Sequence, residues 1–133
     1  MSVDDVEAGH VQQMERAEEQ AQVVAELLAD PDARVVRAGV EGGGTAVAVL
    51  SDDQALFTAT GVADPGEGKE YQLWILRDGV PVGDVVMPDA DGRVRAVTGA
   101  FAAGDALAMT IEPRGGSDEP TTEPVVMLDA TQA

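Results

Sequence analysis

The sequence contains no cysteine and a single histidine, His10. The lack of thiols excludes disulfide bonds, thiolate zinc sites and cysteine nucleophiles, and one histidine is too few for an ordinary zinc site. A serine nucleophile needs a neighbouring base, but Ser2, Ser51 and Ser117 stand in predicted tails or turns, away from His10. We therefore predict that the chain is not an enzyme and has no catalytic residue and no cofactor.

Basic residues are also scarce, because eight Lys and Arg stand against 25 Asp and Glu, giving a formal net charge of −17. Such a chain repels nucleic acid and anionic membrane surfaces, so we expect neither as a partner. No apolar run approaches the ~20 residues of a membrane-spanning helix. Residues 1–10 carry acids where a signal peptide has a basic and then an apolar region. The sequence therefore predicts no direct membrane insertion by this chain.

Residues 1–30 form the predicted N-terminal unit, a helix from about Asp4 to Ala29. Its apolar residues recur in steps of three and four, which is typical of an amphipathic helix: Met14, Ala17, Ala21, Val24 and Leu28. We expect a solvated start and an end docked on the following domain, near Leu27 and Leu28. A homodimer through this helix is the alternative. Asp30-Pro31 ends the helix, because the residue before proline is disfavoured in the α region.

Residues 31–129 form the predicted main domain, and residues 130–133 a C-terminal tail. Short β-branched runs, separated by Gly, Pro and Asp turns, cover 34–40, 45–51, 55–60, 70–77, 80–87, 93–98, 106–112 and 125–128. No helical pattern stands between them. The fold class is therefore mainly β: an antiparallel sandwich of about eight strands, Greek-key and immunoglobulin-like in general shape. We expect 70–77 to be a central strand, Asp78-Gly79 a hairpin turn and Pro81 part of an edge strand.

Two weak metal candidates remain. Asp89 and Asp91, followed by Gly92, resemble the start of a calcium loop, but a strand follows where further ligands would be needed; we predict a turn. Met87, Met109 and Met127 lie on three predicted strands, and thioethers bind Cu(I). Methionines in strands are more often core residues, so we predict no metal and place all three in the core.

Two segments together resemble the C-terminal domain of anti-sigma-K factors of the RskA type. The first is Tyr71-Gln72-Leu73-Trp74, followed by Asp78-Gly79; the second is Glu112-Pro113-x-Gly115-Gly116-Ser117, followed by Pro120 and Pro124. The resemblance covers about residues 22–128. We expect these residues to be structural: Tyr71, Leu73 and Trp74 in the core, the glycines at positive φ, and the prolines stiffening the loop.

The resemblance implies a regulatory domain on the extracytoplasmic face of a bacterial membrane. In that family a cytoplasmic domain binds an extracytoplasmic-function sigma factor, and regulated proteolysis releases it. The implied partners are therefore proteins, namely a site-1-type protease or a signal protein; the sigma factor binds a cytoplasmic domain that this sequence lacks. Residues 1–30 would be the juxtamembrane stalk. The alternative is a free-standing secreted or surface domain that binds a ligand.

Overall fold

The computed structural model describes residues 22, 25–87 and 91–132, and within them the chain forms eight strands. The strands are β1 (Arg34–Gly39), β2 (Thr45–Leu50), β3 (Ala55–Thr60), β4 (Lys69–Arg77), β5 (Val80–Met87), β6 (Arg93–Thr98), β7 (Ala106–Pro113) and β8 (Val126–Leu128). A short 3₁₀ helix, η1 (Ala130–Gln132), follows. Each strand lies within a residue or two of its predicted position.

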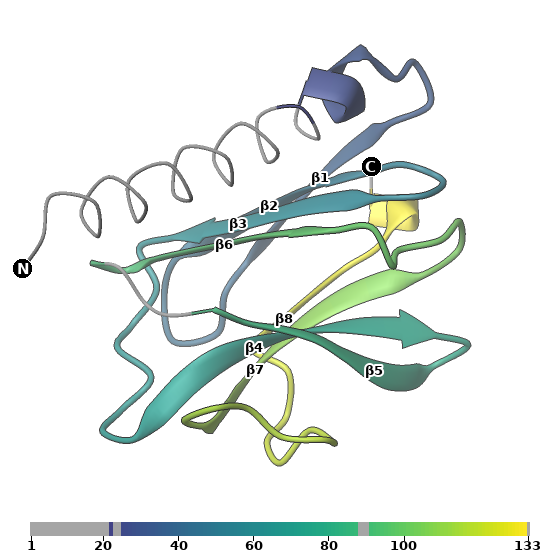
Figure 1. Ribbon diagram of the computed structural model, residues 1–133. Coiled ribbons are helices and arrows are strands. Elements are labelled where there is room, and N and C mark those ends of the chain that lie inside the picture. Colours follow the sequence, from purple (N-terminus) through teal and green to yellow (C-terminus); the bar gives the residue numbers. More distant parts are fainter. Residues whose placement is uncertain (1–21, 23–24, 88–90, 133) are drawn as a thin grey trace, which may run out of the picture.

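The strands build two antiparallel sheets that face each other (Figure 1). The first sheet has the order β1-β2-β3-β6, and the second has the order β5-β4-β7-β8. The chain leaves the first sheet after β3, forms the β4–β5 hairpin in the second, and returns so that β6 lies beside β3. This return is a Greek-key connection. The predicted fold class is therefore confirmed, with β4 as a central strand and β5, which contains Pro81, at an edge.

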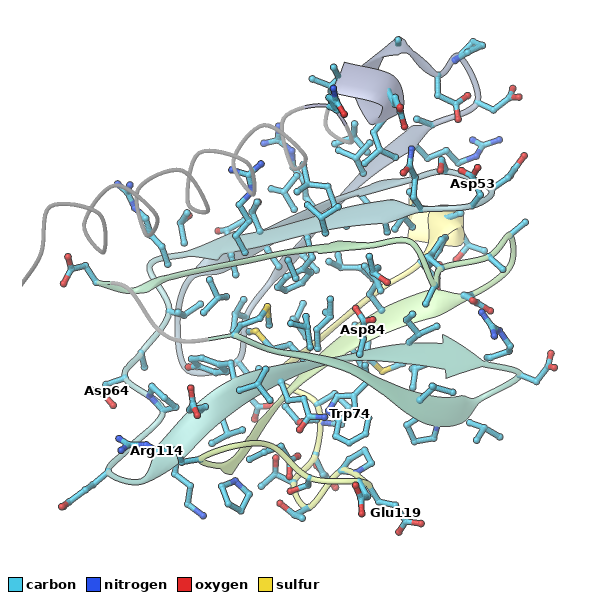
Figure 2. The ribbon with its side chains drawn as sticks, viewed as in Figure 1. Asp53, Asp64, Trp74, Asp84, Arg114 and Glu119 are labelled. Atoms are coloured by element: carbon cyan, nitrogen blue, oxygen red, sulfur yellow. The ribbon has the colours of Figure 1, made fainter. Side chains whose placement is uncertain are left out.

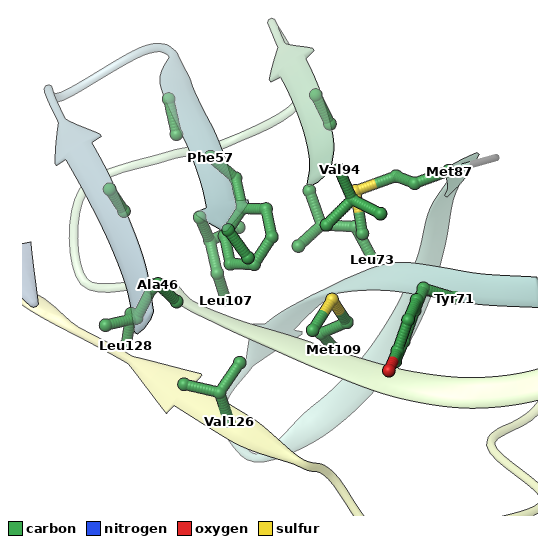
Figure 3. Close-up of a cluster of buried hydrophobic side chains, with 14 of the residues drawn as sticks. Ala46, Phe57, Tyr71, Leu73, Met87, Val94, Leu107, Met109, Val126 and Leu128 are labelled. Carbon is green, nitrogen blue, oxygen red and sulfur yellow. The ribbon is translucent and has the colours of Figure 1, made fainter. Parts of the chain in front are cut away.

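The main core lies between the two sheets (Figure 3). Strand alternation directs one side of every strand inward, so small residues of the first sheet, such as Ala46 and Ala48, oppose larger residues of the second. Phe57 and Val94 come from the first sheet, and Leu73 and Met109 from the second; all four are at most 3% exposed. Valine and alanine thus build a tight core around few aromatic rings.

The hairpin between β4 and β5 follows from two residues. Asp78 and Gly79 have φ values of 54° and 78°, so both central positions of the turn are left-handed. Glycine adopts such angles freely and aspartate tolerates them. The predicted hairpin turn is therefore confirmed.

The structure corrects two of the expected core positions. Leu28, which the predicted apolar stripe places on the docked side, is 69% exposed, whereas Leu27 is 1% exposed. Met127 is 49% exposed, because its neighbours Val126 and Leu128 occupy the inward positions of β8. Met87 and Met109 lie in the core as expected.

The N-terminal part of the chain is described only in part. Residues 25–29 are helical, and they lie over the outer side of the first sheet (Figure 1). The predicted helix before residue 22, with its possible dimer contact and His10, lies outside the described residues. Within the described residues no helix combines the length and the apolar character needed to cross a bilayer.

Candidate functional site

The loop of residues 114–125 folds back over the outer side of the second sheet. Three backbone groups of this loop are held by side chains of β4. The amide of Gly115 donates to Glu70 Oε1 at 3.0 Å. Gln72 binds Ser117 twice: its Oε1 accepts from the Ser117 amide at 2.8 Å, and its Nε2 donates to the Ser117 carbonyl at 3.1 Å. Hydrogen bonds from side chains of β4 therefore fix the position of Gly115 and Ser117 over the sheet.

Beneath the loop, a chain of hydrogen bonds joins β4, β7 and the loop. Trp74 Nε1 donates to Thr110 Oγ1 at 2.7 Å, and the Thr110 hydroxyl donates to Glu112 Oε2 at 2.6 Å. Thr121 closes the chain, because its hydroxyl donates to Glu112 Oε1 at 2.6 Å and its amide reaches both carboxylate oxygens at 3.1 Å. We call Trp74, Thr110, Glu112 and Thr121 the Glu112 network. Trp74, Thr110 and Glu112 are all 0% exposed.

Glu112 is a buried carboxylate that forms no ion pair with another described residue. Burial is the largest single influence and acts to raise its pKa, but the hydrogen bonds from Thr110 and Thr121 together outweigh it and lower the pKa of Glu112. Hydrogen bonds that are donated to a carboxylate favour its charged form. The network therefore holds a negative charge under the loop, neutralised by donors rather than by an ion pair.

Gly116 allows the loop to approach the sheet closely. Its φ is 87°, and a Cβ at this position would lie 2.6 Å from Val86 Cγ2 and 2.9 Å from Gln72 Oε1. Gly115 is also left-handed, with φ at 91°, but nothing lies within 4 Å of its position for a Cβ. Gly116 is thus required by both backbone angle and space, and Gly115 by angle alone.

The structure brings together most of the residues that carry the family resemblance. Gln72, Trp74, Glu112, Gly115, Gly116 and Ser117 meet on the outer side of the second sheet. Tyr71 and Leu73 face the core, where the Tyr71 hydroxyl donates to the Ala63 carbonyl at 2.6 Å. Asp78 and Gly79 lie apart from this group, in the β4–β5 turn.

Trp74 lies on the side of the second sheet that faces Glu119 and the loop (Figure 2). It is fully buried, as expected, and it lies beneath the loop rather than between the two sheets. Thr110 and Thr121 were missed by the sequence reasoning. Their signal was the alternation of β7, which sets Thr110 and Glu112 on one side, away from Met109.

A β-bulge in the edge strand β5 directs Asp84 toward the first sheet (Figure 2). Asp84 Oδ1 accepts from the Thr98 hydroxyl at 3.1 Å, but the buried Oδ2 has no hydrogen-bond partner. Burial is the main cause that raises the pKa of Asp84, and the Thr98 hydrogen bond partly opposes it. This carboxylate is therefore a local cost to the fold.

Asp105 is the contrasting case. Its Oδ2 lies 2.7 Å from Arg77 Nη2 and also accepts from the Ala102 amide. The hydrogen bonds from Arg77 are the main cause that lowers the pKa of Asp105. The pair fixes the loop before β7 to the end of β4.

The described residues contain no group of three or more His, Asp or Glu side chains placed to hold a metal ion. Of the two residues of the weak calcium candidate, Asp91 is exposed in a turn with φ at 57°, and Asp89 lies outside the described residues. The hydroxyls of Thr110 and Thr121 both donate to Glu112, beneath the loop. This arrangement fixes the loop to the sheet.

A hollow of about 580 Å³ lies at one end of the second sheet, between residues 64–70 and Arg114. Its lining mixes Lys69 and Arg114 with Asp64, Glu67 and Glu70. No single sign of charge dominates it, so its chemistry does not select a ligand class.

Comparisons with known proteins agree on one family. The family model described as anti-sigma-K factor RskA, C-terminal, matches residues 4–125. An uncharacterized protein in the phr 5′ region of Streptomyces griseus is 35% identical over 121 residues, covering 89% of this chain and 51% of the relative.

Two proteins named anti-sigma-K factor RskA are also similar. The one from Mycobacterium sp. (strain KMS) is 34% identical over 110 residues, with 80% of this chain and 45% of the relative covered. The one from Mycobacterium tuberculosis (strain H37Ra) is 36% identical, with 74% and 44% covered. The chain spans about half the length of the curated relatives it matches. No solved structure matches the chain.

Proposed function

Because the chain belongs to the family of anti-sigma-K factor RskA C-terminal domains, we propose that it is the extracytoplasmic regulatory domain of a membrane anti-sigma factor. The family is regulatory, and the names of its members imply that they control transcription through a sigma factor. On this proposal the chain has no enzymatic activity of its own. It controls an extracytoplasmic-function sigma factor through regulated proteolysis of the protein to which it belongs.

The observation that carries the proposal is the match over residues 4–125 together with the structural place of the matching residues. Gln72, Trp74 and Glu112 hold a loop on a sheet and expose no reactive group. Residues used in this way specify a folded state rather than a reaction. On this proposal, the folded domain regulates by covering or uncovering another segment.

We propose that the sandwich covers the N-terminal stalk, which joins it through residues 25–33. A protease needs an extended stretch of chain in its cleft, so a segment that is helical and docked resists cleavage. The partners in this proposal are a site-1-type protease or a signal protein. The sigma factor binds a cytoplasmic domain outside this chain. The net charge of −17 makes nucleic acid and anionic lipid poor partners.

The test uses the full-length protein in its own cell. We would remove residues 31–129, and separately introduce Trp74→Ala, which takes the buried ring out of the Glu112 network. Both changes should deregulate the sigma factor's target genes. On an immunoblot, both should also increase the amount of a cleaved fragment that is smaller than the intact variant. Val80→Ala, at an exposed position at the start of β5, is the matched control and should leave both unchanged. Unaltered target transcription after removal of the sandwich would overturn the proposal.

A free-standing secreted or surface ligand-binding domain is the competing function. Sequencing of the DNA upstream of the codon for Met1 separates the two. An in-frame membrane helix preceded by a helical domain supports the anti-sigma proposal. A signal peptide directly upstream, with no such domain, supports the alternative.

A further inference from the structure

The outer side of the first sheet has an unusual composition for so acidic a chain. By strand alternation, the outward positions are those opposite the buried residues of β1, β2, β3 and β6. They hold Arg37, Arg93 and Arg95, with Val, Leu, Thr and Gly elsewhere, and no Asp or Glu. The chain as a whole has 25 acids and eight basic residues. We call this surface the arginine face.

The three arginines are exposed, and none of them forms an ion pair with another described residue. Their charges are therefore available to a carboxylate that approaches from outside the sheet. The neighbouring Val47, Leu56 and Val97 offer apolar surface between them. A partner that fits this face carries acids beside an apolar stripe.

The helical residues 25–29 already lie on this face (Figure 1). Leu27 and Val49 are 1% and 8% exposed, and both lie outside the core between the sheets. Glu26 Oε2 accepts a hydrogen bond from Gln54 Nε2 at 3.4 Å, just before β3 begins. A tight turn at 30–33, in which the Ala33 amide donates to the Asp30 carbonyl at 3.1 Å, then leads into β1.

The sequence before residue 25 has the matching charge. Residues 1–24 contain six Asp and Glu and one Arg. If the helix continues toward the N-terminus, Glu19 lies two turns before Glu26 and Glu15 one turn further, so the three share one side. At about 1.5 Å per residue, Glu19 and Glu15 lie ~10 Å and ~16 Å along the axis from Glu26.

The arginines of β6 are spaced to meet them. Thr58 and Thr60 of β3 lie ~13 Å and ~20 Å from Gln54 at about 3.3 Å per residue. Their partners on β6 are Arg95 and Arg93. With the helix axis along β3, each glutamate falls within a few Å of one arginine, a gap that the long side chains can span.

We propose that residues 15–24 continue the helix across the arginine face, with Glu19 pairing with Arg95 and Glu15 with Arg93. The occupant of this face is therefore the chain's own N-terminal segment. This inference deepens the proposed function, because it names the surface that protects the stalk; the docking itself is tested without reference to transcription.

The experiment is a charge swap in the intact 133-residue chain. Arg93→Glu/Arg95→Glu should increase amide exchange and protease cleavage in residues 15–24 by about two- to fivefold or more, as expected for the loss of exposed or partly exposed pairs. Glu15→Arg/Glu19→Arg should have the same effect. Combining all four changes restores opposite charges and should restore protection.

The matched control is Arg34→Glu/Arg114→Glu, which makes the same change in net charge at two exposed arginines outside the arginine face. It should leave residues 15–24 unchanged. Urea unfolding followed by Trp74 fluorescence verifies that every variant keeps the sandwich. Equal amide exchange of residues 15–24 in the Arg93/Arg95 variant and in this control would overturn the docking. So would a failure of the variant with all four changes to restore their protection. Protection that rises with protein concentration would also overturn it, because a second copy would then be the occupant.

If the docking holds and the full-length transcription test fails, only the regulatory proposal falls. If the docking fails and the transcription test succeeds, the sandwich regulates without covering its stalk in this way.

Discussion

Thr110→Val is the most direct test of the Glu112 network, because it removes one hydroxyl and nearly preserves the shape of the side chain. In the structure this hydroxyl both accepts from Trp74 Nε1 and donates to Glu112 Oε2. After the change, the buried indole N–H has lost its partner. The buried carboxylate keeps only the donors supplied by the loop.

The expected loss follows from these two defects. An unpaired buried donor costs ~1–3 kcal/mol, and a hydrogen bond to a charged group contributes ~1.5–3 kcal/mol. The two share one hydroxyl and do not add fully, so the free energy of unfolding should fall by about 2–4 kcal/mol. With about 2.1 cal/mol/K of unfolding entropy per residue, roughly one hundred sandwich residues give ~0.2 kcal/mol/K. The Tm should therefore fall by about 10–20 °C.

Urea and thermal unfolding followed by tryptophan fluorescence measure this loss. Trp74 is the single tryptophan of the chain and is fully buried, so its emission reports on the network itself. Thr60→Val, at an exposed position of β3, is the control for a generic threonine-to-valine change. A Thr110→Val loss within about 0.5 kcal/mol of the control, which is the usual range for surface substitutions, would refute the reasoning.

Three further predictions concern pH and the loop. The pKa of Glu112 is held below its ordinary value of 4.5, so its contribution to stability is present above that pH and is lost as the pH falls through the folded pKa. The urea midpoint of Glu112→Gln should therefore fall less on acidification than the urea midpoint of the parent chain. The pKa of Asp84 is raised above 3.8, so its cost is present above the folded pKa and relieved as pH falls; Asp84→Asn should stabilise the chain at pH 7 by about 1 kcal/mol, and by less at pH 4. Gly116→Ala should lower the Tm more than Gly115→Ala, because only the former places a Cβ 2.9 Å from Gln72 Oε1; equal effects in thermal scans would contradict this.

The sequence was sufficient for the strands because local signals and the fold agree. Asp78-Gly79 tolerates the left-handed angles that the hairpin requires, and the strand before it is apolar on both sides. Strand alternation places Tyr71 and Leu73 on one side of β4 and Gln72 and Trp74 on the other. It did not tell which side of the sheet faced the core, since a loop 40 residues later in the chain covers the other side.

The same limit explains the remaining differences. Thr121 binds Glu112 only because the loop returns to the sheet, and no local pattern specifies that return. The bulge at Asp84 shifts the β4–β5 register, so side-chain direction after it departs from simple alternation. In the helix, the stripe through Leu28 and the alternative through Leu27 differ by one residue, and only the docked surface selects between them.

The crossed order of the strands has a kinetic consequence. Tyr71 of β4 pairs with Ile111 of β7, and Phe57 of β3 pairs with Ala96 of β6, so each sheet contains one pairing between segments about forty residues apart. A loop of this length must close before either pairing can form. The entropic cost of that closure places folding on the order of milliseconds to seconds. Neither sheet is made from one continuous stretch of chain, because β6 joins β3 only after β4 and β5, and β7 joins β4 only after β6. We therefore expect a cut in a connection between the sheets to loosen both of them.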